Sequence, residues 1–375
     1  MLTLHGPQAA RRGTECGDLA LIEDGSVLIS DGVITNVGST RRIENLAAAK
    51  NAEEINAAGQ VVMPGLVDAH VHIPELTGKV TSHMLEFRLG RLMDLWLRHG
   101  TTAIEAKCSG ELRTLKVVSK LEGKWMLAQR TWMTGWGAGI ASAYSDFQLE
   151  YVNSLRTSVL PRLRAKGLTN VMEALCDPRG FHPGAARVLL ASAKELGFSV
   201  KVYGDQAGRS GAAQLAADLQ ALTCAGLNYS NASDIRALSR SRIPAVLLPG
   251  LLHQGQADKP APAREMIDGG VAVALGTGFQ LPQGGAFSMQ AVIGLACGQL
   301  KMSVAEAVTA ATINSAYAAG IGDRCGSLEF GKQADLIFLK VADYRDIPTY
   351  FGANLVGMVM RKGEVAYREG VVTQQ

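Results

Sequence analysis

Two histidines one residue apart, His70 and His72, have the clearest chemical potential in this sequence. They close the apolar run V-V-M-P-G-L-V-D-A-H-V-H-I (residues 61–73), whose composition predicts a buried strand. Side chains two positions apart on a strand point to the same face. Two neutral imidazoles held side by side could bind one divalent metal. The alternative is a pair of histidines that merely fall near each other in a core.

The elements that must position this strand end alternate regularly along the chain. Strands are predicted at residues 61–73, 101–107, 125–133, 170–177, 199–205, 223–227, 244–248 and 271–276. Helices are predicted at residues 82–98, 111–121, 147–164, 184–196, 212–221, 232–241, 263–269, 287–300 and 304–318. This alternation predicts the α/β class and a (β/α)8 TIM barrel, in which the active site lies at the C-terminal ends of the strands.

Both ends of the chain carry a different pattern, with short alternating runs separated by glycine turns. The pairs Asp24-Gly25 and Asp31-Gly32 are typical hairpin signals, and similar runs return at residues 334–340 and 356–367. We therefore expect residues 1–59 and 322–375 to form one small β-rich domain beside a barrel of residues 60–321.

Composition excludes several classes of function. With 375 residues and 47% hydrophobic content, the chain can bury a large core. Lys and Arg number 37 and Asp and Glu 34, and the basic residues are scattered, which argues against a nucleic-acid partner. The 6 cysteines form no C-x-x-C pair and indicate reduced core thiols. Without a signal peptide or an apolar stretch of membrane-spanning length, we expect a cytoplasmic protein with no membrane partner.

Several segments together resemble a known family. They are P-G-L-V-D-A-H-V-H in residues 64–72, G-T-T-A-I-E-A-K (100–107), A-V-L-L-P-G (245–250), A-T-I-N (311–314), G-S-L-E-F-G-K-Q-A-D-L (326–336) and Y-F-G-A-N-L-V (350–356). They resemble the amidohydrolase superfamily and, within it, imidazolonepropionase, which opens a five-membered cyclic amide in histidine degradation. The resemblance implies a metal-dependent hydrolase of non-peptide C–N bonds, a small β-sandwich beside the barrel, and a homodimer.

The chain departs from this family at the strand ends that carry its chemistry. Where the family's fifth strand ends H-A-D-E, this chain has Tyr203 for the metal-binding histidine and Gln206 for the substrate-contacting glutamate. Gly226 replaces the histidine of D-H-L-E after the sixth strand. In the T-D-F-N of the eighth strand, Gly278 replaces the aspartate that holds the metal and acts as general base, and Gln280 follows. The resemblance thus implies a damaged site.

Other residues are candidates for the rim of the site. The family's histidine after the third strand corresponds to Ala138, and its substrate-binding arginine falls near Lys79. His253 follows the seventh strand and could contact substrate, although a solvated loop histidine is the more common case. Tyr203, Gln206 and Gln280 are further candidates for substrate contact. Glu105 and Lys107, at the end of the second strand, could face the mouth, but a supporting ion pair is the simpler interpretation.

Three functions remain open from the sequence. Catalytic zinc usually takes three protein ligands, so His70 and His72 alone would hold one divalent metal, zinc or iron, weakly or not at all. Loss of a general base typically costs about 10²- to 10⁴-fold in rate. The chain is then a hydrolase of cyclic amides with a rebuilt metal site, or a non-catalytic relative that binds a small molecule or regulates. Authentic imidazolonepropionase is the least favoured. In each case we expect both histidines to face Tyr203 and Gly278 in the barrel mouth.

Overall fold

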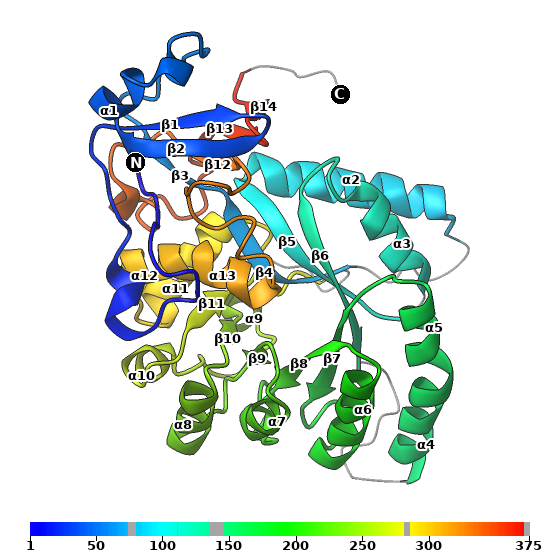
Figure 1. The fold of residues 1–375 in the computed structure, drawn as a ribbon. Coiled ribbons are helices and arrows are strands. Elements are labelled where there is room, and N and C mark those ends of the chain that lie inside the picture. Colours follow the sequence, from blue (N-terminus) through cyan, green and yellow to red (C-terminus); the bar gives the residue numbers. More distant parts are fainter. Residues whose placement is uncertain (74–79, 111, 136–145, 281–285, 371–375) are drawn as a thin grey trace.

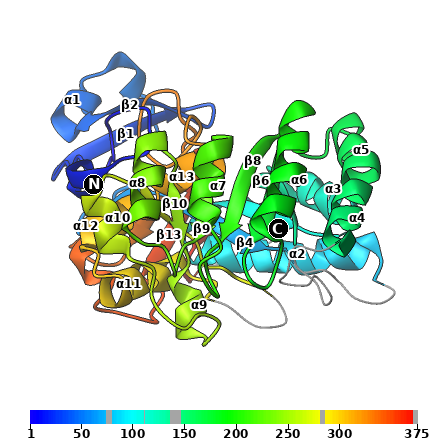
Figure 2. The same ribbon diagram turned by 90° about the horizontal axis from the view of Figure 1, so that it is seen from below.

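The computed structural model describes residues 1–73, 80–110, 112–135, 146–280 and 286–370. In this part of the chain no helix is both long and apolar enough to cross a membrane. The largest sheet here is parallel, with 8 strands in the order β4 to β11, so each strand pairs with its neighbours in sequence (Figure 1). Helices surround it, as Figure 2 shows from a second direction.

Nearly every residue of the barrel strands is buried, as expected for parallel strands with both faces covered. The strands are β4 (Leu66–His72), β5 (Thr101–Cys108), β6 (Leu127–Thr134), β7 (Val171–Cys176), β8 (Ser199–Gly204), β9 (Cys224–Gly226), β10 (Ala245–Leu247) and β11 (Val273–Leu275). The surrounding helices are α2 (Ser82–Arg98), α3 (Leu112–Leu121), α4 (Asp146–Ser154), α5 (Leu160–Ala165), α6 (Pro183–Glu195), α7 (Ala212–Leu219), α8 (Ala232–Ser241), α9 (Pro249–His253), α10 (Ala263–Asp268), α11 (Met289–Gln299), α12 (Val304–Ala310) and α13 (Ile313–Ala319).

Backbone hydrogen bonds close the sheet into a barrel between β4 and the segment that follows β11. The amide of Gly278 donates to the carbonyl of His70 at 3.0 Å, and the amide of His72 donates to the carbonyl of Phe279 at 2.9 Å. The two segments approach so closely that a Cβ on Gly276 would lie 2.8 Å from His70 Cβ. The predicted (β/α)8 TIM barrel is confirmed, and the two histidines lie on its closing strand.

The two ends of the chain form antiparallel sheets beside the barrel, which confirms the predicted small β-sandwich (Figure 1). One sheet has the order β14-β13-β12-β3, from β3 (Val61–Pro64), β12 (Leu336–Leu339), β13 (Val356–Arg361) and β14 (Glu364–Arg368). The other is the hairpin of β1 (Gly25–Ser30) and β2 (Val33–Ser39). Its turn residues Asp31 and Gly32 have φ angles of 53° and 78°, as the predicted two-residue turn requires. Ile34 of β2 packs in one apolar cluster with Val62 and Phe338.

Three sequence predictions were wrong about continuity. The helix predicted at residues 147–164 is interrupted, since the π-helical segment Leu155–Val159 lies between α4 and α5. The apolar run at residues 61–73 is two strands, because β3 pairs with β12 of the small sheet while β4 opens the barrel after Gly65. The helix predicted at residues 304–318 is also two, α12 and α13, with a break at Thr312, whose φ and ψ are −127° and −97°. There the Thr312 hydroxyl donates to the carbonyl of Val308 at 2.6 Å and competes with the helical pattern.

The Asp24-Gly25 hairpin signal was wrong as well. Residues before it form no strand, and Leu21 makes only an isolated antiparallel bridge with Leu2. Asp24 instead accepts the amide of Thr40 through its carbonyl at 3.0 Å. The turn signal therefore marks the entry to β1 rather than a hairpin.

The step from the small sheet into the barrel depends on the missing side chain of Gly65. A Cβ there would lie 2.0 Å from the hydroxyl of buried Thr102. We expect Gly65→Ala to lower the free energy of unfolding by about 1–3 kcal/mol, the usual cost of overpacking a filled core. Urea unfolding followed by circular dichroism measures this.

Gly298→Ala is the matched control, since a Cβ at this exposed position of α11 meets nothing within 4 Å. Alanine in a helix should leave the stability unchanged or raise it by up to about 1 kcal/mol. Equal stability of the two variants would show that the strand break does not depend on this close contact.

Candidate active site

His70 and His72 lie side by side at the C-terminal end of β4, with 0% and 8% of their surface exposed. Their Nε2 atoms are 3.0 Å apart, and the ring planes cross at 67°. Two zinc–nitrogen bonds of about 2.1 Å at a tetrahedral angle would set such nitrogens about 3.4 Å apart. The two rings therefore converge on one point. At this distance one Nε2 donates a hydrogen bond to the other.

Both imidazoles are neutral in these surroundings. Burial and the nearby ammonium of Lys107 lower the pKa of His72 to about 3, and the same causes hold the pKa of His70 well below its ordinary value. His70 Nδ1 is buried and has no hydrogen-bond partner among the residues that the structure describes. A metal-binding histidine almost always donates its second ring N–H to an acceptor that fixes its orientation. No described side chain or carbonyl gives His70 this support.

Tyr203, at the end of β8, packs against this pair. Its ring is fully buried, and its centroid lies 4.8 Å from that of His70. Burial raises the pKa of the phenol, whose hydroxyl donates a hydrogen bond to Gln206 Oε1. A Cβ on Gly226, whose φ is +89°, would lie 3.0 Å from Tyr203 Cε2 and 2.6 Å from the carbonyl oxygen of Gly204. The tyrosine ring thus occupies the space that a side chain at position 226 would need.

Gly278 lies beside His70, to whose carbonyl it donates, and not opposite it as the sequence suggested. Its φ is +64°, and a Cβ would lie 2.9 Å from Leu251 Cγ on α9. Next to it, Thr277 donates to the Asp68 carboxylate through its amide at 2.9 Å and its hydroxyl at 2.5 Å. Burial raises the pKa of Asp68 to about 6. This carboxylate holds the barrel seam together.

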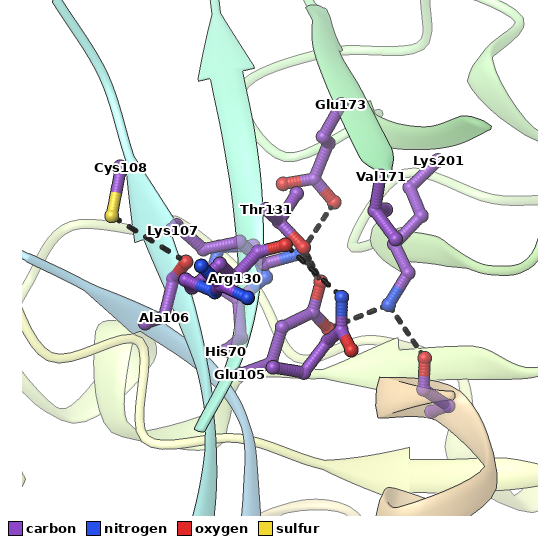
Figure 3. A network of polar contacts seen from close by, with 12 residues as sticks. His70, Glu105, Ala106, Lys107, Cys108, Arg130, Thr131, Val171, Glu173 and Lys201 are labelled. Atoms are coloured by element: carbon purple, nitrogen blue, oxygen red, sulfur yellow. Dashed lines mark hydrogen bonds and ion pairs between the residues drawn. The ribbon is translucent and has the colours of Figure 1, made fainter. Parts of the chain in front are cut away.

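A layer of buried charges lies in the barrel interior close to His70 (Figure 3). Lys107 Nζ pairs with Glu105 at 2.8 Å and with Glu173 at 2.9 Å, and Lys201 Nζ pairs with Glu105 at 2.7 Å. All four side chains are at most 1% exposed. Burial alone would raise the pKa of Glu105, but the two ammonium groups hold it below its usual value. The predicted Glu105–Lys107 pair is confirmed as part of a larger network.

The sequence analysis missed Glu173 and Lys201 in this network. Each lies on a barrel strand two residues before an inward-facing side chain, Leu175 on β7 and Tyr203 on β8. Alternation along a strand was the signal that could have found them, because residues two apart share a face. Lys201 also donates to the carbonyl of Ala318 on α13 at 2.6 Å.

Above the tyrosine lies a cavity of about 370 Å3 at the mouth of the barrel. It is lined by Arg179, Tyr203, Gln206, Ala207, Leu251, Gly255, Gln256, Asp258 and Gln280. Three of the residues predicted to contact substrate, Tyr203, Gln206 and Gln280, thus share one cavity. The sequence analysis missed Arg179, which no spacing distinguishes from other loop arginines.

The remaining predicted rim residues do not join this cavity among the residues described. His253 is exposed on α9, and its ring faces Phe351 with centroids 6.4 Å apart, so the prediction that it contacts substrate gains no support. Lys79 and Ala138 lie outside the residues that the structure describes.

Comparisons with known proteins identify the family of this chain. Residues 239–366 match the Amidohydrolase family. The chain is 34% identical to the imidazolonepropionase of Parabacteroides distasonis, over 97% of this chain and 96% of that protein. It is also 34% identical to the imidazolonepropionase of Solibacter usitatus, over 98% and 97%. The chain belongs to the imidazolonepropionase-like amidohydrolases.

Solved structures agree with this imidazolonepropionase-like amidohydrolase in fold. An adenosine deaminase from Xanthomonas campestris with bound zinc has a TM-score of 0.71 at 18% identity. The match covers 94% of this chain and 91% of the deaminase chain. E. coli guanine deaminase has a TM-score of 0.69 at 18% identity, with 98% and 97% covered. At such identities the likeness concerns the fold alone.

The buried charged layer should contribute measurably to the stability of the fold. Lys107→Met leaves Glu105 and Glu173 buried with one cation fewer, and breaking a buried pair in this way typically costs about 3–5 kcal/mol. We expect a loss of that size in the free energy of unfolding, measured with urea near neutral pH. Lys120→Met is the control, because Lys120 pairs with Glu86 at 2.6 Å with 67% of its side chain exposed. That change should stay within about 1 kcal/mol. Similar losses in both variants would contradict a special role for the buried layer.

Proposed function

We propose that this imidazolonepropionase-like protein has a degenerate metal site and binds a small amide-bearing molecule at the barrel mouth, without the metal-dependent hydrolysis of its relatives. The observation that carries the proposal is the filling of the family's ligand positions by packing. Tyr203 stands at the position of the family's fifth-strand histidine, and its ring fills the space that a side chain at position 226 would need. Leu251 fills the space that a side chain at position 278 would need.

The available donors support this proposal. His70 and His72 offer two nitrogens, but the neutral phenol of Tyr203 is engaged with Gln206, and Gly226 and Gly278 have no side chains. Among the described residues, no group of three or more His, Cys, Asp or Glu side chains could hold a metal ion. Zinc in proteins that use it for catalysis usually has three protein ligands. The donor set described here does not fit such an ion.

The site also has no acidic side chain well suited to act as a general base among the residues described. Asp68 is the acid next to the pair, but its two oxygens accept three hydrogen bonds from Thr277 and His70 that join the barrel seam. An acid committed in this way cannot easily take a proton from water. Without a base, a reaction typically loses about 10²- to 10⁴-fold in rate.

Ligand binding is supported by the cavity itself. Its volume of about 370 Å3 lies near the lower end of the range of small-molecule sites. The carboxamides of Gln206, Gln256 and Gln280 line it, and a carboxamide can both donate to and accept from an amide. Tyr203 and Leu251 supply an apolar floor.

A second candidate is a hydrolase of non-peptide C–N bonds in cyclic amides with a rebuilt metal site. The convergence of His70 and His72, with their Nε2 atoms 3.0 Å apart, favours it. Zinc or iron would then be held by these two residues, and the substrate would have to complete the set. The metal content of the purified protein separates the two candidates. The homodimer and the cytoplasmic location stay predictions.

Restoring the family residues tests the proposal. We expect the native protein to hold well under one equivalent of zinc or iron and not to open the ring of imidazolone propionate. Tyr203→His with Gly278→Asp should gain metal and turnover only when Leu251→Ala is added, because Leu251 blocks a side chain at position 278. Elemental analysis and a ring-opening assay measure both.

The control carries Tyr203→His, Leu251→Ala and Gly278→Ala. It has the same opened space but no carboxylate, so its turnover should be lower by at least about 10²-fold. One equivalent of metal in the native protein, together with ring opening, would overturn the proposal in favour of the second candidate.

A further inference from the structure

Among the residues that the structure describes, the lining of the mouth cavity includes one charge of each sign. Arg179 lies in the loop after β7, and Asp258 lies between α9 and α10. The two are not paired with each other, since no ion pair within 4 Å joins them. We propose that the ligand of this site is a zwitterion of amino-acid size that also carries an amide. Its carboxylate would bind Arg179, and its protonated nitrogen would bind Asp258. This inference rests on the proposed function that the cavity holds a small molecule.

Arg179 is held in a position suited to a carboxylate. Its backbone amide and its Nε both donate to Asp177 Oδ1, each at 3.2 Å. The other oxygen of Asp177 accepts the amides of Gln206 and Ala207 at 2.8 and 3.0 Å, so the loops after β7 and β8 are joined. Only one edge of the guanidinium is engaged by residues that the structure describes. The terminal nitrogens remain for a bidentate pair with a planar carboxylate.

Asp258 is positioned on a different loop. Its Oδ2 accepts the hydroxyl of Tyr229 at 3.3 Å, and Asn228 Nδ2 fixes the same loop by donating to the carbonyl of Lys259 at 2.6 Å. The Lys259 ammonium lies 4.1 Å above the Tyr229 ring and forms no ion pair with Asp258. The carboxylate therefore keeps acceptor capacity for a cation in the cavity.

The other residues that line this cavity suit a short polar molecule. Gln206 Nε2 donates to the carbonyl of Gln256 at 3.4 Å and its Oε1 accepts Tyr203, so this carboxamide has a fixed orientation. Gln280 adds a second carboxamide, and Leu251 an apolar contact. A ligand with only one charge would desolvate Arg179 or Asp258 without giving it a partner, and this loss discriminates against it.

Three probes of nearly the same shape test the inference on the full-length protein by calorimetric titration at millimolar concentrations. L-Glutamine carries a carboxylate, an ammonium and an amide; 4-carbamoylbutanoate lacks the ammonium; 4-aminobutanamide lacks the carboxylate. We expect L-glutamine to bind at least about 10-fold more tightly than either analogue, because a hydrogen-bonded charge contributes that much or more.

Two variants test which charged group of the ligand each protein side chain binds. In Arg179→Gln, L-glutamine should fall to the affinity of 4-aminobutanamide, whose own binding should not change. In Asp258→Asn, L-glutamine should fall to the affinity of 4-carbamoylbutanoate. Arg236→Gln and Asp323→Asn remove exposed charges outside the cavity and should leave all three affinities unchanged.

Equal binding of L-glutamine and one analogue to the native protein would overturn the inference. So would equal weakening of all three probes in either variant, or no binding of any probe. Failure of the proposed function is a separate result, because it appears as metal content and ring opening in the native protein. A metal-loaded hydrolase could still show the charge preference, and a metal-free protein could lack it.

Discussion

Closure of the barrel between β4 and the segment after β11 is the constraint on which the rest of the structure depends. Asp68 accepts hydrogen bonds from the amide and hydroxyl of Thr277 and from the amide of His70, so one buried carboxylate joins the first barrel strand to the segment after the last one. The amide of Gly278 adds a bond to the His70 carbonyl. Because the two histidines belong to this seam, closure of the sheet fixes the backbone from which their side chains project.

Packing at this site couples neighbouring positions to one another. The ring of Tyr203 lies against His70 and leaves room at position 226 only for glycine. Leu251 does the same at position 278, where the backbone is also in the left-handed region that favours glycine. A change at one of these positions is therefore constrained by its neighbour. Such coupling is expected where residues share one closely packed volume.

The barrel has buried charged residues in its interior and exposed charged residues at its mouth. Inside, Glu105, Lys107, Glu173 and Lys201 neutralise one another in full burial, where an unpaired charge would be very costly. At the mouth, Arg179 has 46% of its side chain exposed and keeps part of its guanidinium unengaged by described residues. The inner charges are paired within the core, and the outer charge is open to solvent.

The sequence by itself was enough to predict the family and the barrel, and to place Tyr203, Gly226 and Gly278 at the ends of barrel strands. Local periodicity was strong enough to predict α2 and α8 with their observed bounds, residues 82–98 and 232–241. The tertiary structure alone decided that residues 61–73 split between two sheets, that Gly278 lies beside His70, and that Arg179 shares a cavity with Tyr203. Helix periodicity is a property of neighbouring residues, whereas strand pairing and loop convergence depend on residues far apart in the chain, which only the closed barrel brings together.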